Sequence, residues 1–337
     1  GIECYNYSAL IYAFGQHDVA VTGTGTLDGQ ASLDNWWGWN DKTRPPVRQA
    51  TARQQLADFG ERDVPVEQRR FGAGSWLRPN FLQFYRCERV LVEGVTILRS
   101  PMWEIHPVLS QHVTVRGVTI RSHGPNNDGC DPESSRDVLI EDCVFDTGDD
   151  CIAIKSGRDN DGRRVNVPSE NLVIRRCEMR DGHGGVVLGS EVSGSVRNVF
   201  VEDCRMDSPN LDRALRLKSN ARRGGVLENV FLRRVQVGAV SEAVLTIDFL
   251  YEEGAKGDHR PVARNLQLEQ VTSRQSPRVL FIQGFPGAII DDIRLTDCTF
   301  DGVTTGDVVS GAGRIALTRV TVRPPAPVRS TNSRPKE

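Results

Sequence analysis

One six-residue pattern recurs along this chain: apolar, any, apolar, any, any, then small or apolar. Its clear copies are VLVEGV at 90, VTVRGV at 113, VLIEDC at 138, LVIRRC at 172, VFVEDC at 199, VFLRRV at 230, LQLEQV at 266, IRLTDC at 293 and IALTRV at 315. A weaker copy, VAVTGT, begins at residue 19, and successive clear copies lie 22 to 36 residues apart. Self-similarity at such a period indicates one supersecondary unit that stacks on itself.

The pattern predicts short strands joined by turns. Each copy alternates apolar and other residues with a period of two, β-branched residues are common, and Gly, Asp or Asn stands at the breaks. Helical spacing is almost absent. We therefore predict an all-β fold, a right-handed single-stranded parallel β-helix, in which each coil buries a ladder of like side chains. The framework of leucine-rich repeats and the blade signature of propellers are missing, so those arrays are disfavoured.

Two segments interrupt the repeat. Residues 40–80 form an insertion in which a helix is expected over about 47–59, after Pro46, followed by a loop rich in Pro, Gly and Arg. Residues 322–337 are Pro-rich and polar, as is typical of a flexible tail. The chain is therefore predicted to be a single β-helix domain over residues 1–321 that carries one insertion.

The cysteines fit a stacked fold. Four of them stand at the last position of the repeat, where other copies have valine, so we expect them to be buried thiols in an internal ladder: Cys143, Cys177, Cys204 and Cys298. The other four have no zinc-ligand spacing, and no disulfide can be assigned among them: Cys4, Cys87, Cys130 and Cys151. The cysteines therefore do not indicate in which cellular compartment the protein works.

Composition excludes several classes of function. The net charge is −2 and the pI is about 6.4, so we expect neither nucleic acid nor a membrane surface as a partner. No run of about eighteen apolar residues is present, as a membrane-spanning helix would need. The start of the chain lacks the features of a signal peptide. A bacterial periplasmic or secreted location is nevertheless favoured over a cytoplasmic one, and the oligomeric state is left open.

Four consecutive coils carry the residues that could do chemistry. Each group follows a copy of the repeat, and because coils stack, matching positions become neighbours roughly 4.8 Å apart. One sheet is thus expected to gather three acids, an imidazole and two cations: Asp128, Asp149, Asp150, His183, Arg216 and Lys218.

Strand alternation sets the directions of these side chains. In ALRLKS the two leucines must face the interior, so Arg216 and Lys218 share the solvent face. In CIAIKS the two isoleucines face inward, which places Cys151, Ala153 and Lys155 on the outer side. The glycine before the two adjacent aspartates allows the turn to break the alternation, so that both carboxylates can reach the groove.

Clustered carboxyl groups beside cations suit the hydrolysis of an acidic sugar. Glycoside hydrolysis needs one carboxylic acid to protonate the leaving oxygen and one carboxylate to activate water or attack carbon. Burial and mutual repulsion raise the pKa of one member of such a cluster, which can then hold a proton at neutral pH. Arg216 and Lys218 suit a negatively charged sugar, because both side chains bind carboxylates. The combination indicates a uronic acid polymer.

At these residues the sequence resembles family 28 of the glycoside hydrolases, the polygalacturonase family. The signatures of that family are Asn-Thr-Asp, Gly-Asp-Asp, Gly-His-Gly and Arg-Ile-Lys. In this chain they stand, in the same order, as Asn126-Asn127-Asp128, Gly148-Asp149-Asp150, Gly182-His183-Gly184 and Arg216-Leu217-Lys218. The resemblance extends from ECYNYSALIYAFG near the start to about residue 235.

The resemblance implies a parallel β-helix that cleaves α-1,4-galacturonosidic linkages in pectin or pectic oligosaccharides with inversion. In this family's pattern Asp149 is the general acid, Asp128 and Asp150 activate the water, and His183 tunes or orients the acids. The substrate would be held by Arg216, Lys218 and Asn126. The resemblance implies neither a cofactor nor a metal ion. Two departures, Asn127 for Thr and Leu217 for Ile, remove no catalytic group.

Three further stretches are similar to the bacterial, exo-acting branch of the family. They are the aromatic cluster at Trp36, Trp37 and Trp39, the insertion at 40–80, and SPMWEIHP at 100–107. In that branch insertions block one end of the cleft, so that only a chain terminus enters. The tryptophans, including Trp103, could stack on sugar faces or could equally seal the end of the helix.

Other interpretations stay open at this point. The adjacent acids alone could be an acidic turn or half of a calcium site. A pectate-lyase-like enzyme on the same architecture would bind calcium with its acids and remove a proton with a base, and a non-catalytic β-helix would only bind polysaccharide. Five histidines have no role, although His106 could line a subsite: His17, His106, His112, His123 and His259. Three arginines are expected in a solvated loop: Arg69, Arg70 and Arg78.

Overall fold

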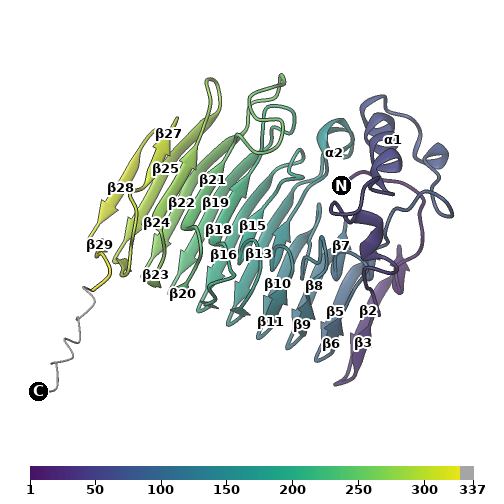
Figure 1. The fold of residues 1–337 in the computed structure, drawn as a ribbon, viewed down its shortest axis with the longest axis horizontal. Coiled ribbons are helices and arrows are strands. Elements are labelled where there is room, and N and C mark those ends of the chain that lie inside the picture. Colours follow the sequence, from purple (N-terminus) through teal and green to yellow (C-terminus); the bar gives the residue numbers. More distant parts are fainter. Residues whose placement is uncertain (327–337) are drawn as a thin grey trace, which may run out of the picture.

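The chain winds into a stack of coils, each of which passes through three strand positions (Figure 1). The structure is a computed structural model, and it describes residues 1–326. In the described part every paired strand runs parallel to the equivalent strand of the coil before and after it. The fold is therefore a parallel β-helix, as predicted, and it has the right-handed sense of nearly all parallel crossovers.

The first sheet carries the repeated sequence. Its ten strands are β2 (His17–Thr22), β5 (Glu88–Glu93), β8 (Gln111–Arg116), β10 (Arg136–Glu141), β13 (Ser169–Arg175), β16 (Val196–Glu202), β19 (Val226–Arg233), β22 (Val262–Glu269), β25 (Ile289–Thr296) and β28 (Ile315–Thr318). Val138 pairs with Val113 on one side and with Leu172 on the other, so equivalent residues of successive copies lie directly beside one another. The repeat in the sequence therefore sets the register in which the strands of this sheet pair.

The second sheet follows the first after a short turn in each coil. Its ten strands are β3 (Thr26–Asp28), β6 (Thr96–Leu98), β9 (Thr119–Ser122), β11 (Val144–Thr147), β14 (Glu178–Met179), β17 (Arg205–Met206), β20 (Gln236–Ala239), β23 (Thr272–Gln275), β26 (Thr299–Phe300) and β29 (Thr321–Val322). Strands of two to four residues suffice here because each, except the edge strands β3 and β29, pairs with a neighbour on both sides.

The third face of the helix consists of two groups of strands. Near the N-terminal end lie β1 (Ile11–Phe14), β4 (Leu82–Tyr85) and β7 (Ile105–Val108). Further along lie β12 (Ile152–Ile154), β15 (Val186–Leu188), β18 (Arg213–Lys218), β21 (Ala243–Asp248), β24 (Arg278–Gln283) and β27 (Val308–Ser310). Single bridges at Cys130 and Glu133 link β7 to β12, so the third face is continuous.

The predicted cysteine ladder is present in the core. Cys143, Cys177, Cys204 and Cys298 are buried, and each thiol donates a hydrogen bond to a backbone carbonyl of the preceding coil. All eight cysteines are free thiols in the structure. The cysteines thus replace valine as small buried groups whose weak donors are satisfied without a disulfide.

A second ladder of amides stands outside the core, within the strands of the first sheet. Asn171 donates to Asp137, Asn198 to Asn171, Asn229 to Asn198, and Asn265 to Asn229, at 2.7 to 3.0 Å. All five residues have φ between 54° and 60°, a left-handed conformation that Asn and Asp tolerate better than other side chains. The stacked amides therefore fix the same local backbone in successive coils.

The insertion and one later connection contain the helices. These are η1 (Trp37–Asn40), α1 (Ala50–Glu61), η2 (Val66–Gln68) and α2 (Asp159–Val165). The helix expected over about 47–59 corresponds to α1, displaced by two or three residues. The sequence did not predict α2, because its seven residues, DNDGRRV, have no apolar periodicity. It lies beside α1 (Figure 1), where the Asn160 side chain donates to the Glu61 carbonyl.

The expectation of a solvated arginine loop is wrong for two of its three members. Arg70 is exposed, but Arg69 has 0% and Arg78 has 4% of its surface exposed. Arg69 pairs with the buried Asp161 of α2 at 2.7 Å. A guanidinium can be buried in this way when oxygen acceptors surround it. Sequence alone could not predict this burial, because all the acceptors except the Val64 carbonyl come from parts of the chain far from the two arginines.

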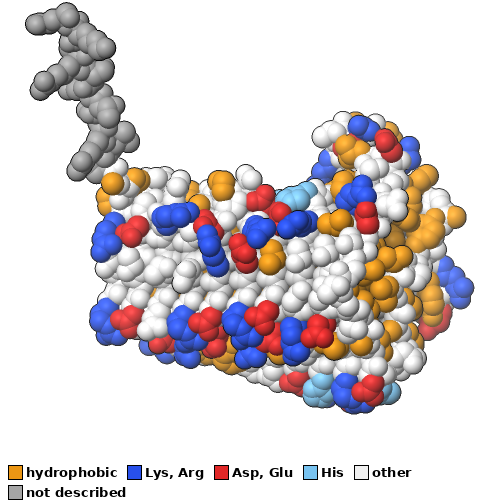
Figure 2. Space-filling model, turned by 90° about the horizontal axis from the view of Figure 1, so that it is seen from below, with side chains coloured by type: hydrophobic (Ala, Val, Ile, Leu, Met, Phe, Trp, Pro, Cys, Tyr) orange, Lys and Arg blue, Asp and Glu red, His pale blue; other side chains and the backbone are white. Residues whose placement is uncertain are grey.

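Charged side chains cover much of the outer surface as pairs. Figure 2 shows basic and acidic groups alternating in rows along the stack, with hydrophobic groups gathered at the N-terminal end. Many pairs join successive coils, such as Arg176 to Asp142 and Arg234 to Asp203. No helix of the described residues is both long and apolar enough to cross a membrane. Of the tail predicted for 322–337, Val322 belongs to β29, residues 323–326 are exposed without regular structure, and 327–337 lie outside the described residues.

Candidate active site

Four consecutive coils contribute to one cluster at the start of the strands of the third face. Asp128 follows β9, the adjacent acids Asp149 and Asp150 lie between β11 and β12, and His183 lies between β14 and β15. One carboxylate oxygen from each aspartate lies within 4.8 Å of the others. The structure therefore brings together the three acids that the sequence placed on neighbouring coils.

The two predicted cations lie beside Asp150. The Lys218 ammonium donates to Asp150 Oδ2 at 2.7 Å, and Arg216 Nη1 lies 4.0 Å from Asp150 Oδ1. Burial lowers the pKa of Lys218, but the charge of Asp150 outweighs it, so this pKa is raised. Both cations also lie 5.4 Å from the centre of the Tyr251 ring. Sequence reasoning missed Tyr251, which lies in a loop outside the repeat.

His183 forms an ion pair with Asp149. The two atoms Nδ1 and Oδ1 are 3.0 Å apart. Burial raises the pKa of Asp149, but the hydrogen bond from His183 and the charges of Lys218 and His183 lower it to about 2. The same hydrogen bond raises the pKa of His183. Asp149 is therefore ionised, and its carboxylate favours the protonated form of His183.

Asp128 has the opposite electrostatic environment. It is 3% exposed, and burial together with the charges of Asp131 and Asp149 raises its pKa well above the usual value. Of these two acids, Asp128 is thus the one whose surroundings favour the protonated form, whereas those of Asp149 favour the charged form. A raised pKa within the cluster agrees with the sequence argument, but that argument could not say which acid would have it.

Lys155 is a further cation at the cluster. Its ammonium lies 3.7 Å from Asp128 Oδ2, 3.5 Å from Asp131 Oδ1 and 3.2 Å from Glu191 Oε2, and 4.5 Å from the centre of the Trp103 ring. The charges of these acids outweigh burial and raise its pKa. Alternation had placed Lys155 on the outer side of its strand without a role; in the structure it is buried beneath the neighbouring loops.

Asn126 and Asn127 have different surroundings. Asn126 Nδ2 lies 3.5 Å from Asp149 Oδ2, so its amide faces the cluster. Asn127 is fully buried, and its Oδ1 accepts from the Ser122 hydroxyl at 2.6 Å and from the Gly124 amide at 2.9 Å. The departure from the family motif at position 127 therefore shapes the loop and does not enter the acid cluster.

Only part of the acid cluster is exposed to solvent. The side chain of His183 is 53% exposed and that of Asp149 is 18% exposed, whereas Asp128, Asp150 and Lys218 have at most 6% exposure as whole residues. The sequence argument had all six side chains lining an open groove. Instead, a ligand meets His183 and Asp149 first, and the other acids lie deeper.

Three polar atoms at the bottom of the site point to a ligand. Within residues 1–326, no protein group hydrogen-bonds to Asp128 Oδ1, Asp150 Oδ1 or Arg216 Nε, although all three are buried. Buried polar atoms nearly always have partners, and exceptions cluster at functional sites. The two oxygens can accept from a water molecule, and the guanidinium can donate to an anion.

The same acids are a poor site for a divalent cation. Their spacing alone would allow one. However, Lys218 and Lys155 already supply two buried positive charges to Asp150 and Asp128. An added dication would be repelled at this short range. The calcium-dependent alternative is therefore disfavoured by the charge arrangement of the residues themselves.

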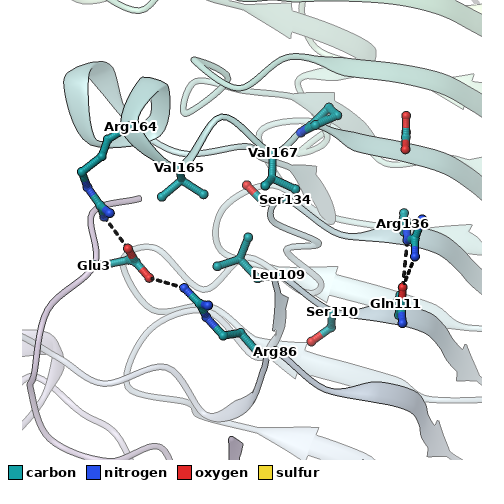
Figure 3. Close-up of a pocket in the computed structure, with 12 residues that line it drawn as sticks. Glu3, Arg86, Leu109, Ser110, Gln111, Ser134, Arg136, Arg164, Val165 and Val167 are labelled. Carbon is teal, nitrogen blue, oxygen red and sulfur yellow. Dashed lines mark hydrogen bonds and ion pairs between the residues drawn. The ribbon is translucent and has the colours of Figure 1, made fainter. Parts of the chain in front are cut away.

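A separate pocket of about 590 Å³ lies away from this cluster, between the end of α2 and the start of the first sheet (Figure 3). In it Glu3 lies between Arg164 and Arg86 and pairs with both. Arg136 donates to Gln111. Its three arginines are therefore already bound to side chains of the pocket, two of them to Glu3 and one to Gln111, and it has none of the acids gathered at the other site.

Fold and site together define a β-helical, carbohydrate-active class of protein. The family model for glycosyl hydrolases family 28 matches residues 72–314. The chain belongs to this family, and the predicted resemblance is confirmed.

Similar proteins agree with this membership. A hyperthermoactive exopolygalacturonase from Thermotoga maritima is 44% identical, with a TM-score of 0.93 over 96% of this chain and 73% of that chain. A probable polygalacturonase from Vitis vinifera is 28% identical over 308 residues, which cover 87% of this chain and 54% of that protein. A polygalacturonase from Erwinia carotovora, 21% identical with a TM-score of 0.66 over 93% of this chain and 75% of that one, shares the fold. The chain thus spans about half the length of the grapevine relative.

Proposed function

We propose that this protein hydrolyses α-1,4-galacturonosidic linkages of pectic polysaccharide or oligogalacturonides from a chain end. The observation that carries the proposal is the position of three acids within 4.8 Å of one another, directly beside Arg216 and Lys218. Acids suit glycosidic cleavage, and paired cations suit a sugar carboxylate. Family membership and the similarity to a bacterial exopolygalacturonase support the same reaction.

The general acid in this proposal is Asp149, which is the most exposed of the three acids. It is ionised in the free site because His183 and Lys218 lower its pKa. A substrate carboxylate bound to Lys218 would neutralise that cation and place a negative charge nearby, and both effects raise the pKa of Asp149. Asp149 can then take up a proton and deliver it to the glycosidic oxygen as the bond from that oxygen to the anomeric carbon breaks.

Asp128 and Asp150 would activate the water. Each has one buried oxygen without a protein partner, and both oxygens can accept hydrogen bonds from the same molecule. The water oxygen bonds to the anomeric carbon, and its proton passes to one of the two carboxylates. For Asp128 this requires loss of the proton that burial favours, which the nearby ammonium of Lys155 assists.

The insertion supports attack at a chain end. Trp37 from η1 packs against Gly124, where an added Cβ would lie 2.2 Å from the indole, and its nitrogen donates to the Ser100 carbonyl at 2.8 Å. Asn40 donates to Asn126 at 3.0 Å. The insertion therefore stands directly against the loop that precedes the acid cluster, where it would close one end of a bound chain. Trp37 is thus half-buried and held against the loop that precedes the acid cluster.

Product analysis tests the proposal. On oligogalacturonates of defined length we expect monogalacturonate from the earliest time points, new reducing ends, no unsaturated ultraviolet-absorbing product, and unchanged rates in chelator. Oligomers of mixed length at early times would contradict end-wise attack. Unsaturated products lost in chelator would identify a lyase, and binding without turnover a non-catalytic protein. Rhamnogalacturonan oligomers, tested in parallel, show which linkage is accepted.

The anomer of the first product tests inversion in the same reaction. The carboxyl groups of inverting enzymes are usually about 6.5–9.5 Å apart, whereas oxygens of this cluster lie within 4.8 Å. Inversion therefore requires the water to sit at the deep oxygens of Asp128 and Asp150, on the far side of the sugar from Asp149. Nuclear magnetic resonance of fresh product should show the β anomer. The α anomer would mean a covalent intermediate.

The ion pair of His183 gives a pH-dependent prediction. We expect the His183 pKa, measured by titration of its ring resonances, to lie above 6.5 and to fall in Asp149→Asn, since Asp149 is the largest cause of the shift. Because the folded pKa is raised, the pair stabilises the protein fully below about pH 6.5, and this contribution is lost as pH rises through the folded pKa. An unshifted His183 in the wild-type protein would show that the pair does not form.

A further inference from the structure

Arg78 is a buried cation without an acidic partner. It lies at the end of the insertion, before β4, and is 4% exposed. Its hydrogen bonds go to neutral oxygens: the Pro101 carbonyl at 2.9 Å, the Pro125 carbonyl, Gln49 Oε1 at 3.4 Å and Asn126 Oδ1 at 2.7 Å. Burial and the charge of Arg53 lower its pKa to about 10, so it is charged at neutral pH.

The contacts of Arg78 fix the amide of Asn126. Arg78 Nη2 and Asn40 Nδ2 both donate to Asn126 Oδ1, at 2.7 Å and 3.0 Å. An amide whose oxygen is held by two donors must turn its nitrogen the other way, and here Nδ2 lies 3.5 Å from Asp149 Oδ2. Asn126 also has φ of 57°, so the loop needs support to stay in this conformation.

We propose that Arg78 is a positioning residue that couples the insertion to Asp149 through Asn126. The Arg78 guanidinium donates hydrogen bonds to the Pro101 and Pro125 carbonyls and to the Asn126 side chain. It thereby links the insertion to the loops around these residues at the edge of the acid cluster. The donor that Asn126 presents to Asp149 then has a fixed direction, which preorganises the site before substrate arrives. The inference rests on the proposed function, since it assumes that Asp149 acts in catalysis.

If Arg78 had a purely structural role, we would expect it to form an ion pair with a buried acid, as Arg69 does. Arg69, from the same insertion and also buried, pairs with the carboxylate of Asp161 at 2.7 Å. In the described residues no carboxylate lies within ion-pair distance of Arg78. A buried guanidinium is costly without a counter-ion. Burial of the Arg78 guanidinium beside Asn126 is explained if its role is to orient the Asn126 amide.

A double-mutant cycle tests the inference. We expect Arg78→Met to lower kcat on oligogalacturonate by about 10- to 100-fold, the range for a displaced catalytic group, with KM changed far less. Asn126→Ala should lower kcat similarly, and the double variant should be no slower than Asn126→Ala alone, because Arg78 acts through Asn126. Arg78→Lys should recover part of the loss, since it keeps a donor and the charge.

The controls separate positioning from folding and from the proposed function. Arg70→Met, exposed in the same insertion, should keep the wild-type kcat. If Arg78→Met does not fold, Asn40→Ala removes the second donor to Asn126 and should still lower kcat. Independent, multiplicative losses in the double variant, or an unchanged kcat in folded Arg78→Met, would overturn the inference while wild-type turnover stands. Absence of wild-type hydrolysis would instead overturn the proposed function.

Discussion

Replacing Asp149 with asparagine is expected to lower kcat by about 10²- to 10⁴-fold, the usual contribution of general acid catalysis. The amide keeps the shape of the side chain but cannot deliver a proton to the leaving oxygen. Folding should be preserved with at most a small loss of stability, because the variant loses the ion pair with His183 but also removes one of three like charges that lie within 4.8 Å of one another. Release of reducing ends and a thermal melt measure the two effects separately.

Asp146 offers a matched control on the same coil. It lies three residues earlier, where it pairs with His123 at 2.6 Å, outside the three-acid cluster. Asp146→Asn should keep the wild-type kcat. Equal losses in the two variants would mean that charge at this edge matters in general, and an undiminished kcat in Asp149→Asn would remove Asp149 from the mechanism.

The fold could be predicted because the solenoid repeats one short-range rule. Each copy of the pattern specifies its own strand, and stacking then aligns equivalent residues, as the pairing of Val113, Val138 and Leu172 shows. The helix α2 and the burial of Arg69 escaped prediction because their partners come from segments outside the repeat. Asp161, for example, lies 92 positions from Arg69.

The same distinction applies to the site. Asp128, Asp149, Asp150, His183 and the two cations sit at matching places on the repeat, so the sequence placed them together. Tyr251 and Arg78 come from a loop and from the insertion, where no register constrains them. The sequence also could not predict how deeply each side chain is buried. It predicted an open groove, whereas Asp150 has 0% of its surface exposed. Depth also decides which acid favours the protonated form, since burial is the largest cause of the raised pKa of Asp128.

Replacing Lys218 with methionine is expected to reduce both stability and substrate affinity. Asp150 would lose its 2.7 Å partner and keep only Arg216 at 4.0 Å. Leaving one member of a buried ion pair unpaired costs about 3–5 kcal/mol. KM should rise as well, because under the proposed function Lys218 binds the substrate carboxylate. Midpoints of urea unfolding and KM on oligogalacturonate measure the two losses. Lys256→Met, at an exposed lysine, is the control.

A double variant shows whether the ion pair between Lys218 and Asp150 serves the fold or the reaction. Lys218→Met combined with Asp150→Leu removes both charges, and replacing a buried ion pair by apolar groups of similar size is often neutral or stabilising. We therefore expect the double variant to regain the urea midpoint lost in Lys218→Met but to have no activity, because Asp150 is part of the proposed mechanism. That outcome would mean that Lys218 and Asp150 are kept for the reaction at the expense of stability. A double variant as unstable as Lys218→Met would assign the pair to the fold.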